Sequence, residues 1–193
     1  MPLTLSQNTE ADALLDRDPL ALLIGMVLDQ QVPLEKAFSS PLELTRRLGH
    51  DLDARELAEF GSDALAEVFA QRPALHRFPT SMAGRVQGVA RVLISDYDGD
   101  VTQLWAGVAD GHELLARITA LPGFGGHKAA IYLALLGKQR NVRPPGWREA
   151  AGDFGKDGVY MSVADITDSE SLLRVRDFKQ QQKQKAAAKA AVT

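Results

Sequence analysis

The segment from Leu121 to Lys138 constrains the fold more than any other part of the chain. It reads LPGFGGHKAAIYLALLGK, so a proline and three closely spaced glycines directly precede a helical pattern that is apolar on nearly every side. A helix without a polar face must lie inside the molecule, whereas glycines allow backbone conformations that other residues avoid. The segment before it, DGHELLARITAL, also has apolar residues at helical spacing. We therefore expect a helix, a short glycine-rich hairpin and a second helix over residues 110–138.

Most of the remaining sequence also carries helix signals, and strand signals are almost absent. Asp18-Pro19 is a strong helix start, because aspartate caps a first turn and proline suits the first helical position. The residues that follow, LALLIGMVL, are apolar nearly all round and predict a central helix. The segment SMAGRVQGVARVLISDYDGD predicts a further helix. Shorter helices are expected over residues 34–38, 41–48, 54–60 and 63–70. The expected fold class is all-α.

Composition excludes several classes of site. The chain has 193 residues, of which 45% are hydrophobic and 24% charged, as in ordinary globular proteins. It has no cysteine, so disulfides and thiolate-held iron–sulfur clusters are excluded. Its four histidines lack the i, i+4 spacing of metal ligands, so we expect neither a metal site nor a cofactor. Because signal-peptide and membrane-span patterns are missing, we expect a cytoplasmic protein with no membrane partner.

The charges are unevenly distributed along the chain. The net charge of −3 neither indicates nor excludes binding to nucleic acid, because binding depends on where the cations lie. Residues 174–193 carry six lysines and arginines against one aspartate, so the rest of the chain is acidic. This basic tail either reaches a polyanion or is a solvated, Ala- and Gln-rich helix end.

Two of these segments together resemble a known family. The run Leu121-Pro122-Gly123-Phe124-Gly125, between two helical patterns, is similar to the hairpin of the helix-hairpin-helix (HhH-GPD) superfamily of DNA glycosylases related to endonuclease III. Upstream, DPLALLIGMVLDQQV resembles that family's early buried helix and its glutamine-containing turn. The resemblance covers about residues 18–138. It implies two α-helical lobes with a DNA-binding cleft, one formed by residues 19–134 and the other by residues 1–18 and 135–193.

The resemblance also implies roles for individual residues. The hairpin backbone would bind a DNA phosphate, with a monovalent cation possible at the same backbone, and glutamines of the turn would fill the gap left by an extruded nucleotide. From the residues themselves, a helix start suits an anion, and charged side chains in the first turn strengthen it. The alternatives are a plain helix connector and a solvated helix end. The residues concerned are Gly123, Gly125, Gly126, His127 and Lys128 for the hairpin, and Gln30 and Gln31 for the turn.

The sequence departs from the family at the positions that carry chemistry. Bifunctional members have a lysine nucleophile where this chain has His127. Lys128 is one residue later, about 100° further round the helix, so we expect it to point elsewhere and predict no lyase activity. The family's aspartate would fall at Pro145, Gly146 or Trp147, none of which is a carboxylate. Trp147 either stacks on an extruded base or serves as a packing anchor.

The carboxylate role is then open to two residues just beyond this position. Glu149 and Asp153 are candidates, and the alternative is a first-turn helix acid and a turn residue. Arg77 and Arg85 are candidates for phosphate contacts; alternatively they form a solvated rim, with Phe78 plugging the core.

Three functions are therefore compatible with the sequence. The first is a base-excision repair enzyme, a monofunctional N-glycosylase acting on double-stranded DNA with a damaged or mismatched base. The second is a catalytically silent protein that binds DNA damage. The third is a helical adaptor without a nucleic-acid partner, for which the acidic body of the chain is the best argument.

Overall fold

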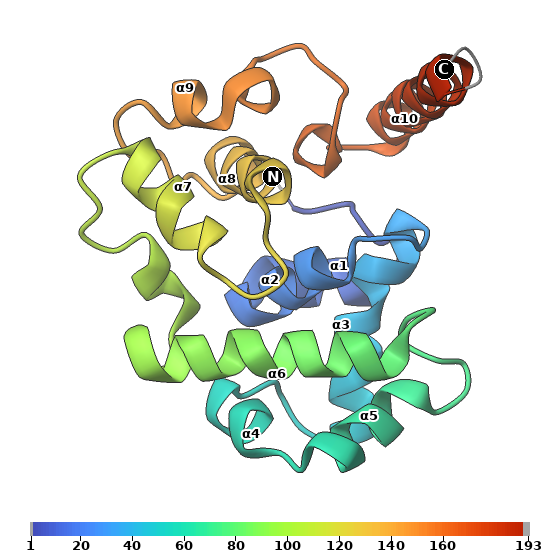
Figure 1. The fold of residues 1–193 in the computed structure, drawn as a ribbon, viewed down its shortest axis with the longest axis vertical. Helices are drawn as coiled ribbons and strands as arrows, with labels where there is room; N and C mark the ends of the chain where they lie inside the picture. Colours follow the sequence, from blue (N-terminus) through green and yellow to red (C-terminus); the bar gives the residue numbers. More distant parts are fainter. Residues whose placement is uncertain (1, 191–193) are drawn as a thin grey trace.

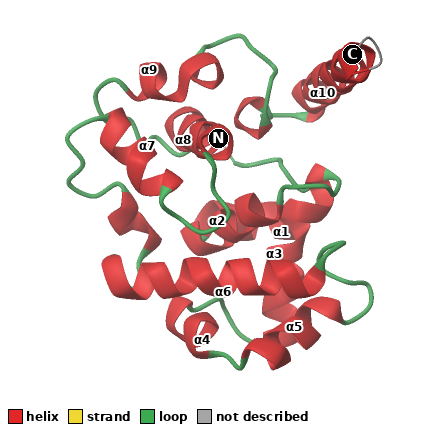
Figure 2. Ribbon diagram, viewed as in Figure 1, coloured by secondary structure: helices red, strands yellow, loops and turns green. Residues whose placement is uncertain are grey.

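The structure is all-α, as the sequence predicts. The computed structural model describes residues 2–190, with side chains through residue 188, and over this range it contains α- and 3-10 helices and no strand (Figure 2). The elements are α1 (Thr9–Arg17), α2 (Pro19–Leu28), α3 (Leu34–Leu48), α4 (Ala54–Glu59), α5 (Ser62–Ala70), α6 (Pro79–Asp96), η1 (Val101–Leu104), α7 (Gly111–Thr119), α8 (Gly126–Gln139), α9 (Trp147–Ala151), η2 (Gly152–Gly155), η3 (Val163–Asp165) and α10 (Ser169–Ala190).

The long helix α6 organises one end of the molecule. In Figure 1 it runs across the lower half, and α4 and α5 pack against it from below. Helix α2 contacts both α3 and α6 on the other side of this layer. Helix α8 packs against α7, α9, η2 and η3 in the upper half of the view. Helix α10 extends away at the upper right, with its start next to η3.

Helices α2 and α8 are the buried helices that their apolar patterns predict. Every residue of α2 from Leu20 to Leu28 is buried. Its start is fixed by Asp18, whose side chain accepts a hydrogen bond from the N–H of Leu20, and by Pro19 in the first turn. In α8, the residues from Tyr132 to Gly137 are all buried. None of the described helices has the length and apolarity needed to cross a membrane.

The prediction of two short helices over residues 34–48 is wrong. The structure has one helix, α3, with Pro41 inside it. A proline in a helix interior removes a backbone hydrogen bond, which is why the sequence indicates a break. Apolar residues on both sides of the proline, Phe38 and Leu44 among them, are nonetheless fully buried. Burial of one continuous apolar face therefore outweighs the local cost of the proline.

Trp147 is the packing anchor of this part of the fold. Its side chain is 6% exposed, and it lies against two glycines where no side chain would fit. A Cβ atom added at Gly137 of α8 would approach the indole ring to 2.4 Å, and one at Gly111 of α7 would approach the backbone of Trp147 equally closely. Of the two interpretations of Trp147, packing between helices is the one observed.

The buried apolar side chains form one cluster that extends from Leu3 to Val175. The assignment of residues 19–134 to one lobe, and of residues 1–18 and 135–193 to another, stays a prediction. Residues 191–193 and the side chain of Lys189, which belong to the predicted basic tail, lie outside the described residues.

Candidate functional site

The loop between α7 and α8 presents exposed backbone at a helix start. Gly123 has a φ of +83°, in the left-handed region that favours glycine. Phe124 beside it is buried, and its N–H donates to the carbonyl of Leu121 at 3.0 Å, which fixes the turn. Gly125 precedes the first turn of α8 and provides no side-chain cap, while Gly126 begins the helix. Both are exposed, and a Cβ atom at either would meet no other atom within 4 Å. A ligand can therefore approach this helix start closely.

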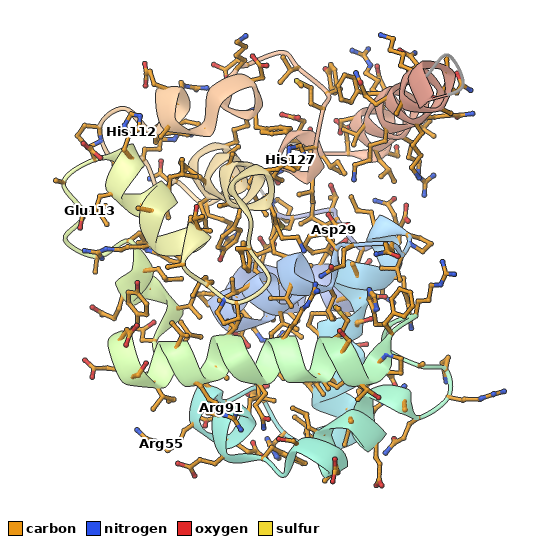
Figure 3. All side chains as sticks on the ribbon, viewed as in Figure 1. Asp29, Arg55, Arg91, His112, Glu113 and His127 are labelled. Carbon is orange, nitrogen blue, oxygen red and sulfur yellow. The ribbon has the colours of Figure 1, made fainter. Side chains whose placement is uncertain are left out.

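A cleft of about 930 Å³ lies beside this helix start. Its walls come from the end of α2 and the turn after it, from the first turn of α8 and from α10. In Figure 3, Asp29 just after α2 and His127 in α8 mark two of these walls. The cleft brings together several residues that the sequence predicts for a site, namely Gln30, Gln31, Arg77, His127 and Lys128.

Lys128 connects α8 to the end of α2. Its Nζ donates to the carbonyl of Met26 at 2.9 Å and to that of Val27 at 3.1 Å. These carbonyls belong to the last turn of α2, the negative end of the helix dipole. Burial lowers the pKa of Lys128 to about 8, and the negative charge of Asp29 acts in the opposite direction. Lys128 is therefore a half-buried cation that holds the turn after α2 in place.

Gln30 is held by hydrogen bonds at four of its atoms, one of which is its backbone N, whose N–H donates to the carbonyl of Leu28 at 2.7 Å. Its Nε2 donates to the carbonyl of Val27 at 2.7 Å, and its Oε1 accepts from Arg85 at 2.5 Å. Its backbone carbonyl is 2.8 Å from Nε2 of His76, a side chain that is only 2% exposed. Nδ1 of His76 accepts the N–H of Phe78, so the proton lies on Nε2 and is donated to Gln30. Gln30 is a fixed part of the wall.

Gln31 differs from Gln30 in its exposure, its hydrogen bonds and its backbone conformation. It is exposed, and among the described residues its side chain has no hydrogen-bond partner. Its φ is +55°, a left-handed conformation that is uncommon for residues other than glycine. Such conformations persist where the surroundings enforce them, often where a ligand is bound. Gln31 is therefore the glutamine of the pair whose side chain is open to a ligand.

The two carboxylates predicted from the sequence lie elsewhere. Glu149 and Asp153 line a separate hollow of about 600 Å³. Asp153 pairs with Lys156 at 2.6 Å, and this hydrogen-bonded ion pair lowers the pKa of the carboxyl. The structure does not bring either residue together with the glutamine turn.

The cleft also contains carboxylates that the sequence did not predict for a site. Glu35, in the first turn of α3, forms an ion pair with Arg176 of α10. Asp29 is the C-cap of α2 and lies close enough to Lys128 to act on its charge. A carboxylate at a helix C-terminus opposes the helix dipole, so its position has no evident benefit for the helix. That unfavourable position was the signal in the sequence that could have indicated Asp29.

The remaining predicted residues are spread around the cleft. Arg77 lines it, with its guanidinium 5.3 Å from the ring centre of Phe78. Phe78 is 42% exposed, so the prediction that its side chain fills part of the core is wrong. In this loop the side chain of His76 is buried instead. Arg85 contributes indirectly, because it donates a hydrogen bond to the side-chain oxygen of Gln30. His127 packs edge-on against Phe154, with ring centres 5.1 Å apart. The side chains of His127 and Lys128 therefore point in different directions, as their spacing predicts. Both residues nevertheless line the cleft.

No group of three or more potential metal-ligating side chains occurs within the described part of the chain. Comparisons with models of protein families, with curated proteins and with solved structures find no match.

Proposed function

We propose that this protein binds duplex DNA at a damaged or mismatched base and hydrolyses the N-glycosidic bond of that base once it is extruded. The observation that carries the proposal is the single cleft in which the exposed Gln31, the cations Arg77 and Lys128, and the carboxylate of Asp29 lie beside the open start of α8.

The start of α8 suits a DNA phosphate. Its first-turn N–H groups receive no side-chain cap, and the glycines before it leave them accessible. The positive end of the helix dipole attracts an anion, and His127 and Lys128 lie in the same turn. Contacts of this kind fix the position of a DNA strand and carry no sequence information. They explain how the protein would hold any duplex.

The turn after α2 suits a distorted duplex. An enzyme reaches a base inside DNA by turning the nucleotide out of the stack, which is least costly at a damaged or mismatched pair. Gln31, with an unbonded amide, would enter the resulting gap. Gln30, fixed by Arg85 and His76, would keep the turn rigid behind it. This division of roles gives both glutamines a function.

The reaction needs a carboxylate near the sugar. When the bond between the base nitrogen and C1′ breaks, the base keeps the bonding electron pair and positive charge develops at C1′. Water then adds at C1′, and the proton that the water releases ends on the departed base. A carboxylate stabilises that charge or accepts a proton from the water. We assign this role to Asp29 because it lines the cleft, whereas Glu149 and Asp153 line the separate hollow.

A second function, a catalytically silent binder of DNA damage, is favoured by the position of Glu149 and Asp153 outside the cleft. In that case the same cleft recognises a distorted duplex without chemistry.

Single-turnover assays on duplexes that contain uracil, alkylated, oxidised or mismatched bases separate the two functions. We expect base release by the wild type, loss of release in Asp29→Asn, and unchanged release in the matched variants Glu149→Gln and Asp153→Asn. If base release were lost only in Glu149→Gln or only in Asp153→Asn, the catalytic carboxylate would lie in the separate hollow that these two residues line. Binding to damaged duplex without release of any base would support the silent binder.

A further inference from the structure

The cleft has one wall that the proposed function does not use. Helix α10 begins at Ser169, and its buried residues Leu172 and Val175 fix this end of the helix against the body of the protein. Further along, the helix extends away from the other elements (Figure 1). The face that carries Leu172 and Val175 also lines the cleft.

Beyond its buried start, the same face of α10 is cationic. Arg176, Lys179 and Lys183 all line the cleft, at the three- and four-residue spacing that places side chains on one side of a helix. The helix also carries Glu170 and Asp177, but neither lines the cleft. The charge that α10 presents to the cleft is therefore uniformly positive.

These cations differ in whether they already have a partner. Arg176 pairs with Glu35 across the cleft. Lys179 and Lys183 form no ion pair with any residue that the structure describes. The opposite wall carries the cations Arg77 and Lys128 together with the carboxylate of Asp29, so its charge is mixed, whereas the wall formed by α10 is positive throughout. The α10 wall is therefore the side of the cleft that is complementary to an anionic chain.

We propose that Lys179 and Lys183 bind the phosphodiester backbone of the DNA, so that α10 forms a second contact opposite the start of α8. The two lysines are about 6 Å apart along the helix axis, more than the ~3.4 Å axial spacing of phosphates along one strand, so each reaches a different phosphate. This inference rests on the proposed function, because it assumes that DNA occupies the cleft.

The test compares two double variants of the full chain that lose the same charge. Lys179→Gln/Lys183→Gln removes the cleft-facing lysines. The control, Lys185→Gln/Arg55→Gln, removes a lysine about 200° round the helix from Lys183 and an exposed arginine of α4, far from α10 in Figure 3. Lys183, Lys185 and Arg55 are exposed, and Lys179 is partly buried. Thermal unfolding verifies that both variants fold as the wild type does.

Fluorescence anisotropy, with plain duplex and with duplex that contains an abasic-site analogue, gives the affinity over a range of salt concentrations. We expect the cleft variant to lose affinity equally for both duplexes. Each lost phosphate contact lowers the slope of log K against log salt concentration by about 0.9, so the slope should fall by about 1.8. We expect the control variant to match the wild type.

The results of these measurements test the proposed function and the role of α10 separately. A wild type that binds neither duplex overturns the proposed function. A wild type that binds while the cleft variant keeps the full slope overturns the role of α10 alone. Equal losses in the cleft variant and the control also overturn it, because they show a general effect of net charge.

Discussion

Gln30 and Gln31 are neighbours in the chain but differ in what holds them. Arg85, His76 and the carbonyl of Val27 fix the first, whereas the second is exposed with a left-handed backbone. The resemblance to glycosylases does not distinguish them. Their structural surroundings distinguish them, so we expect substitution of each glutamine to have a different effect.

Gln31→Ala should weaken binding to a duplex that contains an abasic-site analogue by ~1 kcal/mol, the usual size of one lost polar contact, and leave plain duplex unaffected. Thermal stability should not change. Gln30→Ala is the contrasting variant, because it leaves Arg85 without its acceptor and should lower the melting temperature. Equal losses on both duplexes for Gln31→Ala would contradict the assignment of Gln31 to the gap.

If the proposed function holds, Lys128 should make the affinity for DNA depend on pH. Burial lowers its pKa to about 8, so the ammonium is charged below that pH and becomes neutral as the pH rises through it. Attraction to phosphate is therefore present below pH 8 and fades above it. Anisotropy titrations from pH 7 to 9 should show weakening in the wild type, and a flatter profile in Lys128→Gln. Parallel profiles would show that Lys128 contributes no charge to binding.

At the scale of elements, the hairpin between α7 and α8 and the turn after α2 determine the site. Both lie next to a buried helix, and Lys128 joins the two by its hydrogen bonds to α2. A rigid helix behind each loop means that a ligand meets preformed geometry. The loops can therefore be altered without disturbing the core.

Gly125→Val tests the hairpin. The backbone at Gly125, with a φ of −93°, is open to any residue, and its Cβ would lie in free space, so stability should stay within about 0.5 kcal/mol. The added side chain should cover the N–H groups of α8 and weaken binding to plain and damaged duplex alike. Gly61→Val, at the start of α5, is the matched control. Full affinity in Gly125→Val would exclude the start of α8 as the phosphate site.

The elements were far more predictable than the site. Apolar periodicity indicated α6 and α7, because burial of one face leaves a repeating pattern in the sequence, and apolar residues on nearly every side indicated α2 and α8. The break expected at Pro41 was wrong, because tertiary burial opposed a local signal. Asp29 could not be selected for the site from spacing, since its neighbour Lys128 is about a hundred residues away in the chain. A pairing across such a distance appears only once the helices are packed.

In the molecule as a whole, helix α8 contributes residues both to the hydrophobic core and to the wall of the cleft. Its first turn lines the cleft, while its far end packs on Trp147 and η3. The ion pair between Lys138 of α8 and the buried Asp165 strengthens the same end. The position of the cleft residues therefore depends on packing at a distance from them.

Gly137→Ala should destabilise the protein by about 1–3 kcal/mol, because its Cβ would approach the Trp147 ring to 2.4 Å. Urea unfolding measures the effect. Gly84→Ala in α6, where a Cβ meets nothing within 4 Å, should leave stability unchanged or raise it by up to about 1 kcal/mol. Similar stabilities for the two variants would contradict the close packing of α8 on Trp147.

Recognition of damaged duplex DNA by the cleft between α2, α8 and α10 is the property that we propose for this protein. The most direct test is the affinity of the wild-type protein for a duplex with an abasic-site analogue and for the same duplex without it, measured at low and high salt. We expect tighter binding to the damaged duplex, and affinities for both duplexes that fall as the salt concentration rises. Equal affinities without dependence on salt, or no binding to either duplex, would contradict it.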